Sequence, residues 1–184
     1  MSVFPPALIG ADRLDVREFG WRDADAVRAV LKDPEALPPG APEDPATIDA
    51  WLSDGVHLLR RSGQGVHLGM FDRGSGQLVG AISLFRADWV VRSAEIGYGV
   101  RPSQRRKGYA TEALAAVSCW ALTTGGLQRV WLTANVDNLA SVRVAVKAGF
   151  TLEGTLRRSA AEPDGLHDQH LFALLDDEIQ VSGK

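Results

Sequence analysis

The stretch from Glu95 to Leu114 constrains the fold more than any other part of the chain. Residues 93–100 alternate between apolar and polar or small side chains, as a half-buried strand does. Pro102 ends that strand, and from Ala110 onward the apolar residues recur at helical spacing. A second apolar strand follows at residues 129–135. This order of strand, helix and strand predicts a right-handed crossover that joins two parallel strands.

The turn between this strand and this helix is strongly basic. It contains Arg101, Arg105, Arg106 and Lys107, and Gly108 follows them at the start of the helix. The first turn of a helix carries partial positive charge and N–H groups without intrahelical partners, so it binds anions such as phosphates. Because glycine has no Cβ, a ligand can also approach the backbone closely. We therefore predict an anion site here, with a solvated basic turn as the alternative.

The amino-acid sequence of the turn does not match the motifs of two common phosphate-binding sites. It does not match G-x-x-x-x-G-K-[ST], the phosphate-binding loop of many nucleotide hydrolases. It does not match G-x-G-x-x-G either, which disfavours a dinucleotide site of the Rossmann type.

Length and composition predict one domain over residues 1–184. The net charge of −3 makes the basic turn a local feature and argues against a nucleic-acid partner. The single cysteine, Cys119, cannot form an internal disulfide, which fits a reducing cytoplasm. We find no signal peptide and no apolar run of about 18 residues, and we expect no membrane span. The histidines show no metal-ligand spacing, so we predict no metal.

The remaining segments predict an α/β chain in the order β-α-α-β-β-β-α-β-α-β-β. We expect residues 1–11 to be a loosely held lead-in and residues 13–178 to form the core. The proline-rich segment 33–46 and the polar segment 158–166 are predicted loops. The predicted strands are 13–19, 65–72, 77–85, 93–100, 129–135, 150–157 and 167–175, and the predicted helices are 23–32, 47–61, 104–124 and 138–149.

Two blocks of the sequence resemble the GNAT (Gcn5-related) N-acetyltransferases. Arg105-x-x-Gly108-x-Ala110 is similar to the R/Q-x-x-G-x-G/A signature with which that family holds the pyrophosphate of acetyl-CoA. The segment 135–154 resembles the family's block N-x-x-N-x-x-S…k-x-G-F-x-x-E-G. The sequence of this block is most similar to that of the Rim-type branch of the family, the ribosomal-protein alanine N-acetyltransferases. With an opening L-x-L-R-like strand at 14–17 and a similar last strand at 168–175, the resemblance covers residues 13–178.

The resemblance implies a mixed, mostly antiparallel twisted sheet with helices on both faces and a central parallel pair that splays apart. Acetyl-CoA would lie in the split, and no other cofactor is implied. The backbone of the strand would pair with the pantetheine arm, the basic turn would hold the pyrophosphate, and the second block would lie near the pantetheine and the sulfur. The implied cofactor-binding residues are Tyr98, Gly99, Val100, Arg105, Arg106, Lys107, Gly108, Tyr109, Ala110, Asn135, Asn138 and Ser141.

The family's chemistry is direct attack of a neutral amine on the acetyl thioester. For the base we favour Glu95, which takes the proton directly or through water, and its alternative role is a salt-bridged strand residue. For the acid that protonates the leaving thiolate, the resemblance implies Ser141, which also suits a local hydrogen bond at a helix start. A backbone N–H of residues 97–100 would stabilise the oxyanion, and Gly97 and Gly99 would permit a bulge there.

The acceptor is the least constrained part of this interpretation. Rim-type proteins often carry a bulky residue where this chain has Gly99, and we expect the small residue to widen the acceptor end. A peptide N-terminal amine is the favoured acceptor. The alternatives are a small-molecule amine and a non-catalytic acyl-CoA-binding module. A monomer and a homodimer are both compatible with the sequence.

Overall fold

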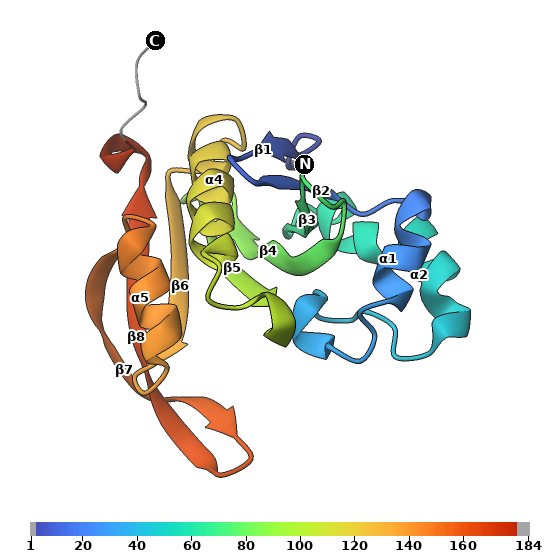
Figure 1. The fold of residues 1–184 in the computed structure, drawn as a ribbon. Coiled ribbons are helices and arrows are strands. Elements are labelled where there is room, and N and C mark those ends of the chain that lie inside the picture. Colours follow the sequence, from blue (N-terminus) through green and yellow to red (C-terminus); the bar gives the residue numbers. More distant parts are fainter. Residues whose placement is uncertain (1–2, 180–184) are drawn as a thin grey trace.

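One eight-stranded sheet forms the centre of the molecule (Figure 1). The computed structural model describes residues 3–179, and the order of its strands across the sheet is β1-β2-β3-β4-β5-β6-β8-β7. The predicted single domain over 1–184 stays a prediction, since both ends lie outside the described residues. The strands are β1 Leu8–Gly10, β2 Leu14–Glu18, β3 Val66–Asp72, β4 Leu78–Asp88, β5 Ser93–Val100, β6 Arg129–Asn135, β7 Thr151–Glu162 and β8 Gly165–Leu175.

The parallel pair in the sheet is β5 and β6, and this pair is short. Its register contains only Ser93 with Arg129, Ala94 with Val130, and Glu95 with Trp131. Beyond these pairs β5 continues to Val100 along β4, while β6 continues along β8. All other pairs of neighbouring strands are antiparallel. The predicted mixed sheet with a splayed parallel pair is therefore confirmed.

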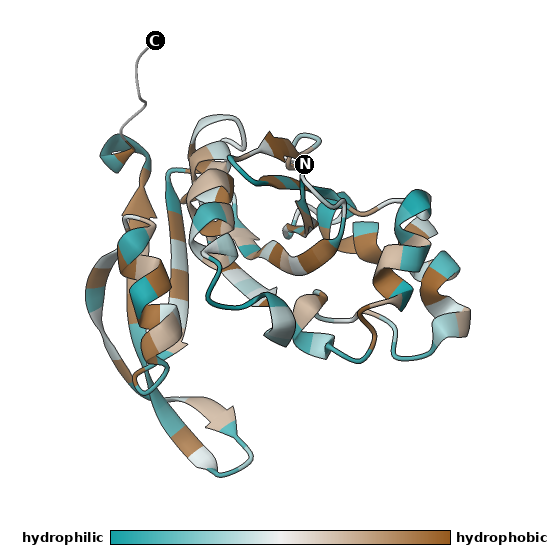
Figure 2. Cartoon of the chain, in the orientation of Figure 1, coloured by the Kyte–Doolittle hydropathy of each residue, from teal (hydrophilic) through white to brown (hydrophobic). Residues whose placement is uncertain are grey.

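Helices cover the sheet on both faces. The long helix α4 (Tyr109–Thr123) lies beside α5 (Leu139–Lys147), and the shorter helices α1 (Ala24–Arg28), α2 (Ile48–Ser53) and α3 (Leu58–Arg61) gather at the other end of the molecule (Figure 1). Two clusters of buried side chains result. Ile82 belongs to the cluster beneath α4, whereas its neighbour Ala81 belongs to the cluster beneath α1 and α2. Since successive strand residues point to opposite faces, the two clusters lie on opposite sides of the sheet. Figure 2 shows mostly hydrophobic residues along β4, whose residues 78–84 are all buried, as expected of a strand covered on both faces.

The predicted helices are shorter than the sequence patterns suggest. The segment predicted as one helix over 47–61 divides into α2, a 3₁₀ turn and α3. The break falls at Asp54 and Gly55, where the conformation of Asp54 is not helical. The central helix begins at Tyr109 rather than near residue 104, because residues 102–104 form a 3₁₀ turn and Gly108 is left-handed, with φ +87°. The membrane prediction was tested on the described helices, none of which is long and apolar enough to cross a bilayer.

Two segments predicted to be irregular are ordered instead. In the predicted lead-in, β1 pairs with β2 and Phe4 is fully buried, with its ring 4.9 Å from that of Trp89 between centroids. The predicted loop 158–166 is mostly strand, because β7 and β8 form a long hairpin that closes at residues 163–164. Its register shifts between Leu152 and Gly154 and again between Leu156 and Ala160. Figure 1 shows the tip of this hairpin extending away from the sheet.

Candidate functional site

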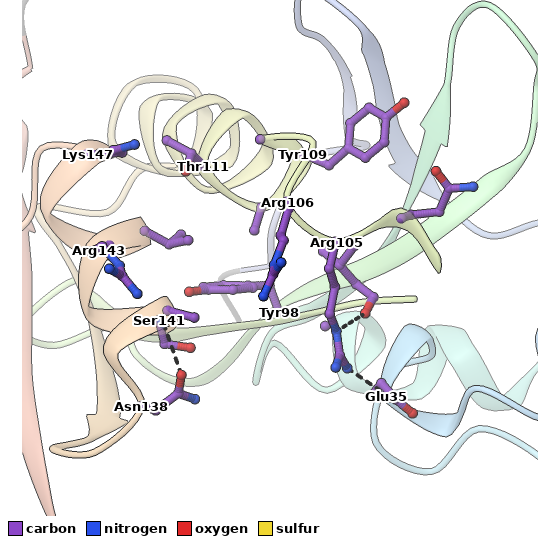
Figure 3. Close-up of a pocket in the computed structure, with 17 residues that line it drawn as sticks. Glu35, Tyr98, Arg105, Arg106, Tyr109, Thr111, Asn138, Ser141, Arg143 and Lys147 are labelled. Atoms are coloured by element: carbon purple, nitrogen blue, oxygen red, sulfur yellow. Dashed lines mark hydrogen bonds and ion pairs between the residues drawn. The ribbon is translucent and has the colours of Figure 1, made fainter. Parts of the chain in front are cut away.

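A cavity of about 790 Å³ opens where β5 separates from β6. The basic turn and the first turn of α4 line one side, and α5 lines the other (Figure 3). The sequence predicted ten of the lining residues, namely Tyr98, Gly99, Val100, Arg105, Arg106, Gly108, Tyr109, Ala110, Asn138 and Ser141. It missed Glu35, Gln104, Thr111, Ala140, Arg143, Val144 and Lys147.

The beginning of α4 has the geometry of an anion site. Gly108 caps the helix with φ +87°, a conformation that L side chains rarely adopt, and no side chain of the described residues caps the helix here. The first N–H groups of this 15-residue helix therefore remain available to a ligand in the cavity. Glu112 does not compete for the cavity, since its carboxylate binds Arg13 with an oxygen–nitrogen distance of 2.7 Å.

The four cations of the basic turn have different partners. Arg101 forms an ion pair with Asp33 at 2.9 Å, and Lys107 donates to the side-chain oxygen of Gln104 at 2.7 Å. Arg105 is held twice, by Glu35 at 2.9 Å and by the carbonyl oxygen of Val100 at 3.1 Å.

Arg106 is the cation of this turn that extends into the cavity (Figure 3), and it has no ion-pair partner within residues 3–179. Arg143 and Lys147 of α5 line the opposite wall. Together these three side chains give the cavity positive charge on two sides. A signal for the α5 residues was present, since Ala140, Arg143 and Lys147 recur at helical spacing, but charged residues on a helix usually indicate a solvated face.

Asn138 and Ser141 lie together at the start of α5. The Asn138 side chain caps the helix by accepting a hydrogen bond from the Ser141 backbone N–H at 3.1 Å. This capping bond accounts for Asn138 locally, while the Ser141 side chain borders the cavity. Burial raises the pKa of Tyr98, and Ser141 is close enough to oppose that effect in part. The two hydroxyls nevertheless do not form a hydrogen bond of acceptable geometry.

Tyr109, one of the expected cofactor-binding residues, also has a structural partner. Its hydroxyl donates to Asp72 at 2.6 Å, and the Arg13 guanidinium lies over its ring, 5.1 Å from the centroid. The same hydrogen bond raises the pKa of Tyr109 and helps to lower the pKa of Asp72 to about 2. These contacts tie the first turn of α4 to the end of β3.

Glu95 is buried at the end of the parallel pair and does not line the cavity. Its carboxylate accepts a hydrogen bond from Arg86 at 2.6 Å. Burial raises the pKa of Glu95, and the charge and hydrogen bond of Arg86 offset this only in part. The Arg86 guanidinium is largely exposed. Glu95 is thus the salt-bridged strand residue considered from the sequence, and its role as the base stays a prediction.

The predicted bulge lies on a different strand. Residues 97–100 of β5 pair with β4 in unbroken register, so Gly97 and Gly99 flank no bulge. The irregularity falls in β4 between Phe85 and Asp88, where Arg86 has φ +53°. A bulge re-aims the side chain next to it, and here it accompanies the contact of Arg86 with Glu95.

The space beside Gly99 is filled, contrary to the expectation of a wider acceptor end. A Cβ at this position would lie 1.6 Å from the carbonyl oxygen of Glu35, in the 3₁₀ turn η2 (Pro34–Ala36). The missing side chain therefore makes room for the backbone of η2. The sequence could not reveal this contact, because it joins segments more than sixty residues apart.

Lys107 and Asn135 do not line the cavity, although both were among the expected cofactor-binding residues. The Asn135 amide donates to Glu162 at 2.9 Å and accepts from Gln169 at 3.2 Å, at the base of the long hairpin. No group of three or more potential metal ligands occurs among residues 3–179.

Comparisons with known proteins agree with this geometry. The family model for the acetyltransferase (GNAT) domain matches residues 13–151. The uncharacterised N-acetyltransferase YoaA of Bacillus subtilis (strain 168) is 28% identical over 175 residues, which cover 94% of this chain and 98% of that protein. The putative ribosomal N-acetyltransferase YdaF of the same organism is 32% identical over 139 residues, 74% of this chain and 75% of that protein.

Solved structures agree as well. The structure of Mycobacterium smegmatis RimJ in complex with CoA-disulfide has a TM-score of 0.82 at 27% identity, covering 97% of this chain and 92% of that one. The strand order, the split between β5 and β6 and the position of the cavity are thus explained together. The chain belongs to the GNAT family of N-acetyltransferases and is similar to Mycobacterium smegmatis RimJ and to the putative ribosomal N-acetyltransferase YdaF.

Proposed function

We propose that the protein transfers the acetyl group of acetyl-CoA to a primary amine, with a peptide N-terminus as the acceptor. The cavity at the open end of β5 carries this proposal, because it joins a helix N-terminus with Arg106, Arg143 and Lys147. Coenzyme A has three phosphate groups, and cations on two walls suit them better than a single basic patch would.

The backbone of β5 beside the cavity can bind the pantetheine arm of acetyl-CoA. Within residues 3–179, the edge of β5 that faces β6 has no strand partner from Ile96 to Val100. Its N–H and C=O groups can pair with the amide groups of an extended pantetheine arm, as a sheet edge pairs with a peptide. In this arrangement the acetyl end points toward Glu95, where the two strands meet.

The chemistry requires a neutral amine next to that end. An α-amine has a pKa of about 8, whereas a lysine side chain has one of about 10.4, so an α-amine needs less help at neutral pH. Glu95 would take its proton directly or through water, and Ser141 borders the position proposed for the sulfur. The similarity to YdaF, a putative ribosomal N-acetyltransferase, also favours a protein N-terminus over a small amine.

A melting experiment with acetyl-CoA tests the donor site first. At 100 times its Kd, a ligand that binds only the native state adds about 2.7 kcal/mol of stability. For a chain of this length we expect the melting temperature to rise by roughly 5–11 °C. A folded protein that shows no rise with acetyl-CoA would refute the proposal.

Thiol release over a panel of acceptors then identifies the amine. The panel should contain peptides with free N-termini, the same peptides with blocked N-termini and an internal lysine, and small amines such as polyamines and aminoglycosides. We expect turnover only with the free N-termini. Turnover only with small amines would show that the acceptor is a small amine rather than a peptide. Binding of acetyl-CoA without turnover of any acceptor would favour a non-catalytic acyl-CoA-binding module.

A further inference from the structure

The hydroxyl of Tyr98 is a buried polar group that the proposed chemistry has not yet used. Its oxygen is shielded from solvent and has no hydrogen-bond partner of acceptable geometry among residues 3–179. Buried polar groups are rarely left in this state, since an unmade hydrogen bond costs stability and phenylalanine would fill the same space.

The position of this hydroxyl indicates its missing partner. Tyr98 lines the cavity from β5, and its ring extends toward α5, with the oxygen directed to the region of Ser141 and Arg143 (Figure 3). The next step rests on the proposed function. With the pyrophosphate at Gly108 and the pantetheine arm along β5, the thioester lies in this part of the cavity. The sulfur of the donor is then the atom that faces the phenol.

We propose that Tyr98 donates the proton that the thiolate needs as it leaves. The amine nitrogen forms a bond to the acetyl carbon, and the bond from that carbon to sulfur breaks. The sulfur departs with the electron pair and takes the phenolic proton of Tyr98. The phenolate regains a proton from solvent that enters the cavity, and the proton released by the amine leaves through Glu95. The products are the acetylated amine and the free thiol of coenzyme A.

Two other observations support Tyr98 as the donor. The second tyrosine of the chain, Tyr109, already donates its hydroxyl hydrogen to Asp72. Burial raises the pKa of Tyr98, so the phenol keeps its proton at neutral pH until a strong acceptor forms beside it. The role of final proton donor, which the resemblance implied for Ser141, thereby passes to Tyr98.

The test removes the hydroxyl alone. In Tyr98→Phe we expect the single-turnover rate of acetyl transfer to fall about 100-fold, in the range of lost general acid catalysis. The Kd of acetyl-CoA should stay within twofold, and the melting temperature should stay equal or rise. The matched control is Ser118→Ala, because Ser118 is the other buried hydroxyl without a partner in the described residues and lies within α4, outside the cavity lining. This control should keep full activity.

Fluorinated tyrosines at position 98 separate proton donation from packing. They keep the ring and the hydroxyl while making the phenol more acidic, so the transfer rate should change with phenol acidity. A Tyr98→Phe variant that binds acetyl-CoA and reacts at the wild-type rate would overturn the inference, and so would a rate independent of phenol acidity. Wild-type protein that neither binds acetyl-CoA nor turns over would instead overturn the proposed function.

Discussion

The two ends of β5 have the same local sequence character and opposite surroundings. From Ser93 to Glu95 the strand has a partner on each side, β4 and β6. From Ile96 to Val100 it keeps only β4, and the cavity takes the place of the other partner. We call these the closed end and the open end.

The difference shows how one strand can serve the core and the site together. The closed end fixes the strand, because its hydrogen bonds are satisfied by protein on both sides. The open end leaves backbone groups for a ligand, at a position that the closed end determines. If this division is correct, variants at the open end and at the boundary residue Glu95 should change binding or turnover, whereas other variants at the closed end should change stability alone.

Glu95, the last residue of the closed end, should give the largest effect. We expect Glu95→Gln to lower kcat by about 100-fold or more, because the amine loses its base, and to leave the Kd of acetyl-CoA nearly unchanged. In the wild type, kcat should fall as the pH drops below the raised pKa of Glu95, because the protonated carboxyl group cannot act as a base.

The pH profile of an Arg86 variant sharpens this prediction. Arg86 opposes the rise in the pKa of Glu95, so Arg86→Ala should move the acid limb of the profile to higher pH while activity at high pH is kept. Full activity of Glu95→Gln across the pH range would place the base elsewhere.

The glycine at the start of α4 should give the next largest effect. Gly108→Ala places a Cβ at a left-handed position, 3.1 Å from a terminal guanidinium nitrogen of Arg13, and so disturbs the helix N-terminus that lines the cavity. We expect the Kd of acetyl-CoA to rise at least about tenfold, or ~1.4 kcal/mol. The control is Gly126→Ala, with φ +81° and no atom within 4 Å of the added Cβ. Both variants should lose about 1–2 kcal/mol of stability. Equal ligand affinity in the two would argue against an anion site at Gly108.

A cation on the far wall of the cavity should matter less. Because Arg143 is exposed, Arg143→Ala should weaken acetyl-CoA binding by about fivefold, or ~1 kcal/mol. The loss should shrink as salt is added, since ions screen the attraction. Arg157→Ala, which removes an exposed arginine of β7 outside the cavity, is the control and should leave the Kd unchanged. A salt-independent loss would point to packing rather than charge.

The contact of η2 with the basic turn should weaken the binding of acetyl-CoA slightly. Glu35 pairs with Arg105 at 2.9 Å, so it competes with any phosphate for that guanidinium. We expect Glu35→Gln to tighten acetyl-CoA binding by about twofold to fivefold, the range of a partly exposed ion pair. Asp33→Asn breaks the neighbouring pair with Arg101 and leaves Arg105 held, so it serves as the control. Weaker binding by Glu35→Gln would mean that Glu35 positions Arg105 for the ligand.

The smallest effect belongs to the closed end. Glu153 of β7 accepts two hydrogen bonds from Arg129 of β6, each 2.6 Å long. Since the pair is partly exposed, Glu153→Gln should cost about 0.5 kcal/mol of unfolding free energy, measured by denaturant titration. Neither kcat nor the Kd of acetyl-CoA should change. A change in either would break the division between the two ends of β5.

The sequence predicted best what depends on neighbours along the chain. The strand, basic turn and helix around Gly108 follow from alternation, helical spacing and one glycine, and all three are present in the structure, with the helix beginning at Tyr109 rather than near residue 104. The resemblance of residues 135–154 to a family block implied that Asn138 and Ser141 lie near the cofactor, and both line the cavity. Sequence patterns predict such elements well because the interactions that form them involve residues only a few positions apart.

What the sequence could not predict depends on contacts between distant segments. Glu35 meets Gly99 and Arg105 only after the sheet has formed, and Arg143 looks solvated until α5 is placed against the cavity. The partner of Glu95 was hidden because a bulge in β4 redirects Arg86. The hairpin beyond residue 157 was missed because its shifted register blurs the period-2 pattern of strands.

That shifted register has a consequence for the solubility of the protein. β7 forms the outer edge of the sheet over twelve residues, and an edge of this length invites pairing with strands of other molecules. The two irregularities in its register and the left-handed Arg158, with φ +52°, interrupt the row of backbone groups that a foreign strand would need. Charged residues at 157 and 158 repel a second edge of the same kind. The hairpin thereby carries its own protection against aggregation.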